Sequence, residues 1–119
     1  MSANDILLLF FLFFTKHYIV DFILQTIQQV RTKGIWAHPV GFSHSLEQGI
    51  WTAVILVFWV DFSFAVMFGW IDVCIHYIVD YCKMRFGSRD MQEKSYWIQM
   101  GLDQYLHYLT YLGLISWIS

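Results

Sequence analysis

One five-residue word, His-Tyr-Ile-Val-Asp, occurs twice in this chain, each time inside a long apolar segment. It spans residues 17–21 and returns at residues 76–80, an offset of 59 residues (76 minus 17). The same offset relates two later polar pairs, each spaced i and i+4: His44 with Gln48, and Asp103 with His107. Because residues at i and i+4 share one face of a helix, the pattern predicts a duplicated unit of two helices.

Charged residues are too few to cover a globule with polar surface. The chain of 119 residues is 58% hydrophobic and 13% charged, whereas a soluble domain has about 25% charged residues. Membrane lipid is therefore expected to surround part of the protein. The net charge of −2, with no basic face along any element, argues against nucleic acid as a partner. The length predicts a single membrane domain over residues 1–119.

Four segments are long and apolar enough to cross the hydrocarbon layer, for which a helix needs about 20 residues. They span about residues 5–29, 39–60, 64–84 and 96–119. The predicted fold is an all-α integral membrane protein, a bundle of four transmembrane helices. It is built from two parallel helical-hairpin repeats, repeat 1 over about residues 5–60 and repeat 2 over about residues 64–119.

The basic residues predict the orientation in the membrane. Six of the seven lysines and arginines lie in or beside the connectors after the first and third segments: Arg31, Lys33, Lys83, Arg85, Arg89 and Lys94. The seventh, Lys16, lies inside the first segment. Since cytoplasmic loops carry an excess of positive residues, we expect cytoplasmic connectors and both termini outside, in a bacterial inner membrane.

Each predicted helix carries its polar residues in one narrow sector. In the first helix this stripe consists of His17, Asp21, Gln25 and Gln28. Lipid would penalise all four stripes, so we expect them to face one another. The convergence brings together seven imidazole and carboxylate groups as candidate metal ligands: His17, Asp21, His44, His76, Asp80, Asp103 and His107.

Neutral histidine and aspartate are good ligands for Zn, Mn or Fe(II), and four-helix bundles hold two-metal carboxylate sites. The sequence therefore predicts a divalent metal site with one or two ions. Glu47, about one turn after His44, is the candidate general base. Two other interpretations of the stripes stay open. They are a proton or cation path, and His–Asp hydrogen bonds that hold the helices in register.

Several short motifs resemble those of a bacterial and phage family of small multi-span membrane proteins of unknown function. They are H-x3-D-F-x-L-Q from His17, the isolated His44, H-x3-D-Y from His76, and D-Q-x2-H from Asp103. The resemblance covers nearly the whole chain. It implies an integral membrane protein and assigns no activity.

Two functions are compatible with these features. The first is metal-dependent hydrolysis of a lipid or lipid-linked phosphoester, in which the metal activates water. The alternative is a non-enzymatic phage-type membrane protein, either an ion- or proton-conducting or holin-like assembly or a small subunit of a larger membrane complex. A homo-oligomer is compatible with either function. The two classes differ in whether the polar stripes close within one chain or line an interface between chains.

Overall fold

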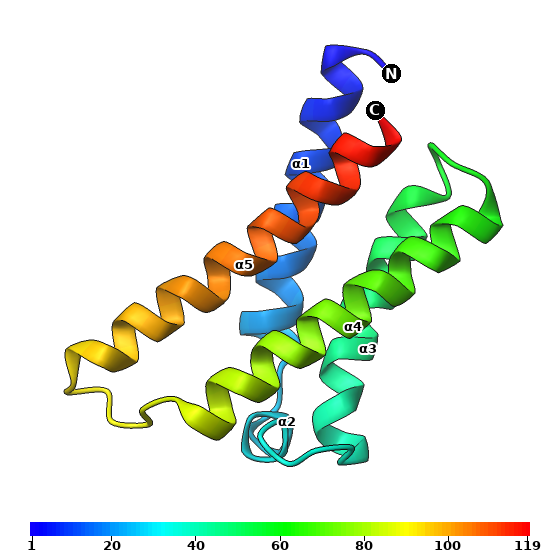
Figure 1. Cartoon of the computed structure of the whole chain (residues 1–119). Helices are drawn as coiled ribbons and strands as arrows, with labels where there is room; N and C mark the ends of the chain where they lie inside the picture. The colour runs from blue at the N-terminus through cyan, green and yellow to red at the C-terminus, as the bar shows by residue number, and fades with distance from the viewer.

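Long helices run alternately up and down through the computed structural model, which describes all 119 residues and contains no strand. They are α1 (Ala3–Tyr18) with its continuation η1 (Ile19–Leu24), α3 (Pro39–Leu56), α4 (Phe62–Phe86) and α5 (Lys94–Ile118). A short helix, α2 (Ile27–Thr32), lies between η1 and α3. Both termini lie at one end of the bundle, and α2 and the α4–α5 connector lie at the other, the connector end (Figure 1).

The all-helical prediction is confirmed, whereas the four predicted spans are supported only in part. Two helical segments are long and apolar enough to cross a membrane: Ala3–Leu24 and Phe62–Phe86. The segments α3 and α5 are less apolar because polar residues such as Gln48, Asp103 and His107 interrupt them. Length and hydropathy therefore do not identify these two helices as spans.

The first helix does not continue to Gln29 as predicted. It becomes a π-helix at Ile19 and ends at Gln25, whose ψ of 124° is extended. Thr26 then starts α2 with a capping box, in which the Gln29 N–H donates to Thr26 Oγ1 (3.1 Å) and the Thr26 N–H donates to Gln29 Oε1 (2.9 Å). The T-x-x-Q pattern is a known helix-start signal. The break turns Gln29 inward and leaves Gln28 exposed, so the predicted place of Gln28 in the polar stripe is wrong.

The break also folds α2 back beneath the bundle. Gln29 Nε2 donates to Ser43 Oγ on α3 (3.1 Å). Further along, the backbone N–H of Ala37 donates to the hydroxyl of Tyr77 on α4 (2.6 Å). The connector from η1 to α3 is thereby attached to two of the long helices.

Helices α3 and α4 approach each other closely at Gly49 and Gly69. A Cβ placed on either glycine would collide with the carbonyl oxygen of the other. Small residues allow helix backbones to approach closely, a device common in membrane interfaces. This contact sets the distance between the two helices that carry His44 and His76.

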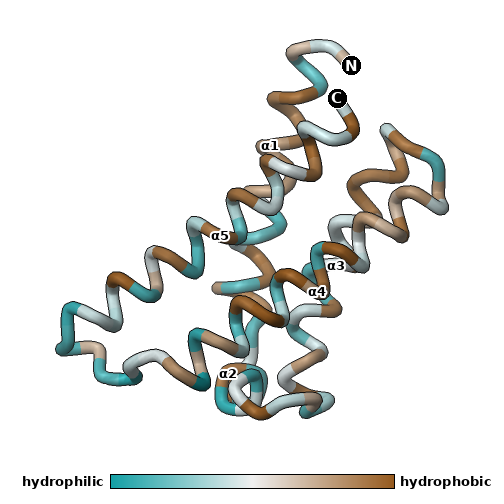
Figure 2. Tube along the Cα trace, viewed as in Figure 1, coloured by the Kyte–Doolittle hydropathy of each residue, from teal (hydrophilic) through white to brown (hydrophobic).

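The interior changes character along the bundle. Toward the termini it is a hydrophobic cluster made of Leu9, Phe13, Leu56, Ala65, Phe68, Tyr111, Leu114 and Ile115. Toward the connector end the buried side chains are mostly polar or charged. Large hydrophobic side chains are instead exposed on every long helix, as with Phe11, Trp51, Trp70 and Leu112. Figure 2 shows strongly hydrophilic residues along α2 and the α4–α5 connector.

Candidate metal centre

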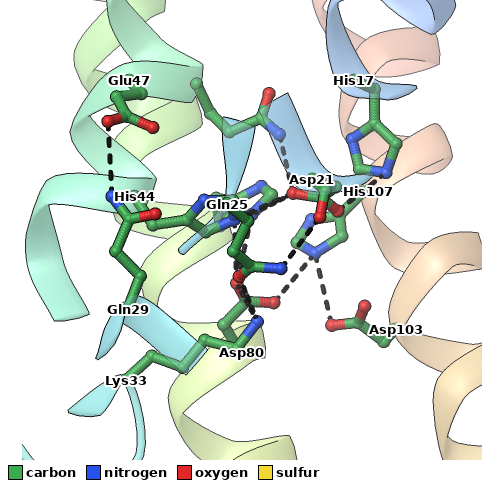
Figure 3. A network of polar contacts seen from close by, with 12 residues as sticks. His17, Asp21, Gln25, Gln29, Lys33, His44, Glu47, Asp80, Asp103 and His107 are labelled. Atoms are coloured by element: carbon green, nitrogen blue, oxygen red, sulfur yellow. Dashed lines mark hydrogen bonds and ion pairs between the residues drawn. The ribbon is translucent and has the colours of Figure 1, made fainter. Parts of the chain in front are cut away.

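All seven predicted metal ligands meet in the half of the bundle near the connector end. Each is no more than 9% exposed. Together they come from every long helix. Figure 3 shows Asp21 and Asp80 lying between the imidazoles of His44 and His107. The polar stripes therefore close within a single chain.

Three donor atoms from α3 and α4 form a compact group, and Asp21 Oδ1 of η1 lies beside both of its imidazoles. His44 Nε2 lies 3.3 Å from His76 Nε2, 3.7 Å from Asp80 Oδ2 and 2.8 Å from Asp21 Oδ1. His76 Nε2 lies 3.2 Å from Asp80 Oδ2 and 3.5 Å from Asp21 Oδ1. A tetrahedral ion with bonds of about 2.0–2.1 Å separates its ligand atoms by about 3.3–3.4 Å. The separations among His44, His76 and Asp80 lie near that value, so these three atoms could hold an ion. Asp21 belongs to a separate cluster with His17 and His76, and it would have to shift to become a fourth ligand.

A second donor group shares Asp80 with the first. His107 Nε2 lies 3.3 Å from Asp80 Oδ1 and 3.3 Å from Asp103 Oδ1. The three residues form one of the clusters whose ligand atoms all lie within 4.8 Å of one another. Asp103 Oδ1 is buried and accepts no hydrogen bond. Because the two oxygens of Asp80 face different imidazoles, this carboxylate could bridge two ions.

His17 reaches the site but uses both ring nitrogens in hydrogen bonds. Nδ1 lies 2.7 Å from the Tyr111 hydroxyl, and Nε2 lies 2.8 Å from Gln104 Oε1 and 3.1 Å from Asp21 Oδ2. Because both neighbours of Nε2 are acceptors, Nε2 carries the proton and Nδ1 accepts from the tyrosine. In this arrangement His17 orients Asp21 and has no free lone pair for a metal.

Two glutamines complete the hydrogen bonding of the carboxylates. Gln48 Nε2 donates to Asp21 Oδ1 (2.8 Å), and Gln104 Nε2 donates to Asp103 Oδ2 (2.9 Å). The motif around Asp103 includes Gln104, but helical periodicity alone does not place it in the stripe. The available signal for Gln104 was its position directly after the candidate ligand Asp103, with which it forms a hydrogen bond.

Two lysines from the connector end also reach the centre. Lys33 Nζ lies 3.5 Å from Asp80 Oδ2 and donates to Gln25 Oε1 (2.8 Å). Lys83 Nζ lies 3.2 Å from Asp103 Oδ2. Lys33 is 12 residues after Asp21 (33 minus 21), and a continuous helix would carry it about 18 Å away along the axis. The break before α2 is what returns this lysine to the site.

Glu47 lies apart from the seven candidate ligands. Its Oε1 accepts from Gln29 Nε2 (3.3 Å), its Oε2 is buried without a partner, and no hydrogen bond or ion pair joins it to a candidate ligand. In Figure 3 it stands apart from the other carboxylates, beside Gln29. The role of Glu47 as general base stays a prediction.

A second polar layer lies between the centre and the hydrophobic cluster. Lys16 Nζ lies 2.9 Å from Asp72 Oδ2 and donates to Gln48 Oε1 (2.7 Å) and the Tyr111 hydroxyl (3.3 Å). Thr52 donates to the same oxygen of Asp72. Buried charges are tolerated when they are paired and hydrogen-bonded. This layer thus joins all four long helices next to the donor atoms.

Comparison with known proteins adds a family but no activity. The family model described as "Protein of unknown function (DUF3307)" matches residues 9–118. This agrees with the expected resemblance to a family of unknown function. No curated protein and no solved structure matches the chain.

Proposed function

We propose that this chain, which belongs to the DUF3307 family, is a membrane protein that binds a divalent first-row transition ion between its helices. The observation that carries the proposal is the spacing of His44 Nε2, His76 Nε2 and Asp80 Oδ2, which lie 3.2, 3.3 and 3.7 Å apart, close to the edges of a tetrahedral site. Nitrogen and oxygen donors of this kind suit Zn, Mn or Fe(II). Asp80 as a bridge would allow a second ion at His107 and Asp103.

The charges of the centre are compatible with a bound ion. Lys33 faces Asp80 and Lys83 faces Asp103, but the ion-pair partners of Asp21 are all histidines. Buried charges in proteins are usually paired or bound to a metal. With neutral imidazoles, a divalent cation supplies the positive charge that Asp21 otherwise lacks.

A membrane location is supported by the distribution of side chains. Paired charges and hydrogen-bonded polar groups fill the interior near the site, while large hydrophobic residues cover the outside of all four long helices. We propose that α3 and α5 cross the bilayer with the two segments that length and hydropathy identify. The basic connectors would then be cytoplasmic and both termini outside.

The proposed duplication is supported by one pair of equivalent contacts. Gln48 Nε2 donates to Asp21 Oδ1, and His107 Nε2 lies near Asp80 Oδ1. The 59-residue offset relates these two contacts (107 minus 48, and 80 minus 21). The Lys16–Asp72 pair has no such equivalent, because the offset places Ile75 and Phe13 at the matching positions.

Hydrolysis of a lipid or lipid-linked phosphoester is the reaction that we propose for the ion. A cleft of about 450 Å³ opens beside the connectors, and its lining includes Asp21 and Asp103. A head group could therefore approach the donor atoms from the membrane surface. Divalent ions promote such reactions by polarising the phosphoryl group and activating water.

Ion or proton conduction is less well supported. The polar residues of the interior extend only to Lys16 and Asp72, beyond which the hydrophobic cluster fills the bundle. A path across the whole membrane would need polar groups through that cluster. The stripes also close within one chain, which makes an interface between chains unnecessary for the site.

Metal analysis of the protein purified in detergent tests the proposal. We expect one or two equivalents of a first-row ion per chain after growth in medium that contains Zn, Mn and Fe. The sample should be washed with a weak chelator so that loosely bound ions are removed. The contrary result is a folded preparation that holds no stoichiometric ion and takes none up when each metal is added. That result would overturn both the proposed metal site and the proposed hydrolysis.

A further inference from the structure

The cleft beside the connectors is lined by four cations and two carboxylates. The cations are Arg31, Lys33, Lys83 and Arg89, and the carboxylates are Asp21 and Asp103. Neither arginine forms an ion pair with an acidic residue; Arg89 donates instead to the backbone carbonyl of Met84 (3.1 Å). The cleft therefore presents two guanidinium groups that are not paired with a carboxylate at the mouth of the proposed metal centre.

The two lysines share their carboxylates with the proposed ion. Asp80 Oδ2 is the oxygen that faces both Lys33 Nζ and His76 Nε2. Asp103 has Lys83 on Oδ2 and His107 on Oδ1. At present the carboxylates of Asp80 and Asp103 pair with the two lysines. An ion held by these carboxylates would neutralise them. Metal binding would thus leave Lys33 and Lys83 in need of another anion.

A charge count gives the same result. Asp21, Asp80 and Asp103 with Lys33 and Lys83 leave one negative charge when the imidazoles are neutral. One divalent ion changes this to one positive charge, and the two arginines of the cleft raise it to three. A centre with this excess beside an open cleft attracts an anion of high charge density.

We propose that the cleft binds a phosphoryl anion and that it does so in a metal-dependent manner. This inference rests on the proposed function and names the chemical class of its ligand. Arginine binds phosphate through its planar fork of N–H donors, and lysine contributes a point charge. The cleft also has the apolar side chains of Phe22 and Met100 in its lining, which suits a phosphate attached to a lipid. The phosphate can belong to a lipid head group or to a soluble molecule.

Calorimetric titration of inorganic phosphate into the protein in detergent tests the coupling. The protein is compared after metal removal and after reloading with Zn or Mn, and metal content is measured in each sample. We expect phosphate to bind the loaded protein at least about tenfold more tightly than the metal-free protein, since allosteric coupling of about 1–3 kcal/mol corresponds to factors of about 5–150. By reciprocity, phosphate should tighten metal binding by the same factor.

A double variant and a matched control separate the cleft from the metal centre. R31Q/R89Q removes the two guanidinium groups, neither of which contacts a candidate metal ligand, so metal content should stay at the wild-type level. Phosphate affinity should fall by about tenfold or more, because the charge-assisted hydrogen bonds from the guanidinium groups to phosphate are lost. R85Q removes an exposed cation that does not line the cleft, and it should leave both affinities unchanged.

A membrane arm identifies the source of the phosphate. Protein in nanodiscs of phosphatidylcholine is compared with protein in nanodiscs that also contain phosphatidic acid, and metal affinity is the readout. Tighter metal binding with phosphatidic acid alone would assign the site to a lipid head group, and an effect of inorganic phosphate alone would assign it to a soluble ligand. If the protein holds its metal and neither anion binds, or if binding is independent of metal, the inference is overturned while the metal proposal stands. A protein that holds no metal would instead overturn the metal proposal itself.

Discussion

Lys16 Nζ lies 2.9 Å from Asp72 Oδ2 in the middle of the bundle, with side chains only 6% and 1% exposed. The two residues are 56 positions apart (72 minus 16) and belong to α1 and α4. Their pairing neutralises both charges beside the donor atoms. Lys16 directly precedes the first copy of the five-residue word. The chain itself supplies its anionic partner, Asp72.

Loss of one partner of this pair should destabilise the protein more than loss of both. Lys16→Met leaves Asp72 buried without its cation, for which we expect a cost of about 3–5 kcal/mol in unfolding free energy. The double variant Lys16→Met/Asp72→Asn leaves no unpaired charge and should recover part of that loss. Denaturant unfolding in detergent, followed by tryptophan fluorescence, measures both. Additive effects of the two single substitutions would contradict a coupled pair.

The Gly49–Gly69 contact predicts a strong dependence on position for glycine substitutions. Gly49→Ala and Gly69→Ala force α3 and α4 apart, and we expect each to destabilise the protein by about 1–3 kcal/mol. Gly113→Ala is the matched control, because a Cβ at this helical position meets nothing within 4 Å. It should be neutral or stabilising by up to about 1 kcal/mol through helix propensity. Equal effects at all three sites would show that the helices do not cross at these glycines.

Substitution of the candidate ligands Asp21 and Asp80 should release the metal without unfolding the bundle. Asp21→Asn and Asp80→Asn preserve size and most hydrogen bonds but remove the ligand charge, so we expect loss of bound ion from either variant. Asp90→Asn, at an exposed carboxylate of the α4–α5 connector, is the control and should bind metal as the wild type does. Metal content measured beside a circular-dichroism melt separates loss of ligand from loss of fold. Full occupancy in both folded variants would indicate that these carboxylates act only as hydrogen-bond acceptors.

Cysteine labelling in intact cells tests the proposed orientation. The exposed Cys74 and Cys82 are first replaced by alanine, and single cysteines are then placed at Ser2, Ser119 or the exposed Gln92 of the connector. An impermeant maleimide should label the two terminal positions from outside and should label Gln92→Cys only after lysis. The reverse pattern would place the connectors outside and leave the helical bundle unaffected.

Sequence patterns were sufficient for the all-helical class, for the approximate positions of the four long helices and for the convergence of the seven candidate ligands. Polar residues spaced i and i+4 in apolar segments have to turn toward one another, whatever the details of packing. Helix starts were also readable in principle, since Thr26 and Gln29 form the capping box that starts α2. The predicted continuation to Gln29 failed because the hydrophobic periodicity was followed past this local signal.

The contacts that distinguish one polar residue from another depended on the packed structure. Periodicity placed Glu47 near His44, but the return of α2 beneath the bundle brings Gln29 to Glu47 and Lys33 to Asp80. Gln104 and Tyr111 occupy both ring nitrogens of His17, a distinction that spacing along one helix cannot make. The physical reason is that helical periodicity specifies the direction in which a side chain points. The partner it meets depends on helix distances and offsets, which are set by contacts such as Gly49 with Gly69 between residues far apart in the chain.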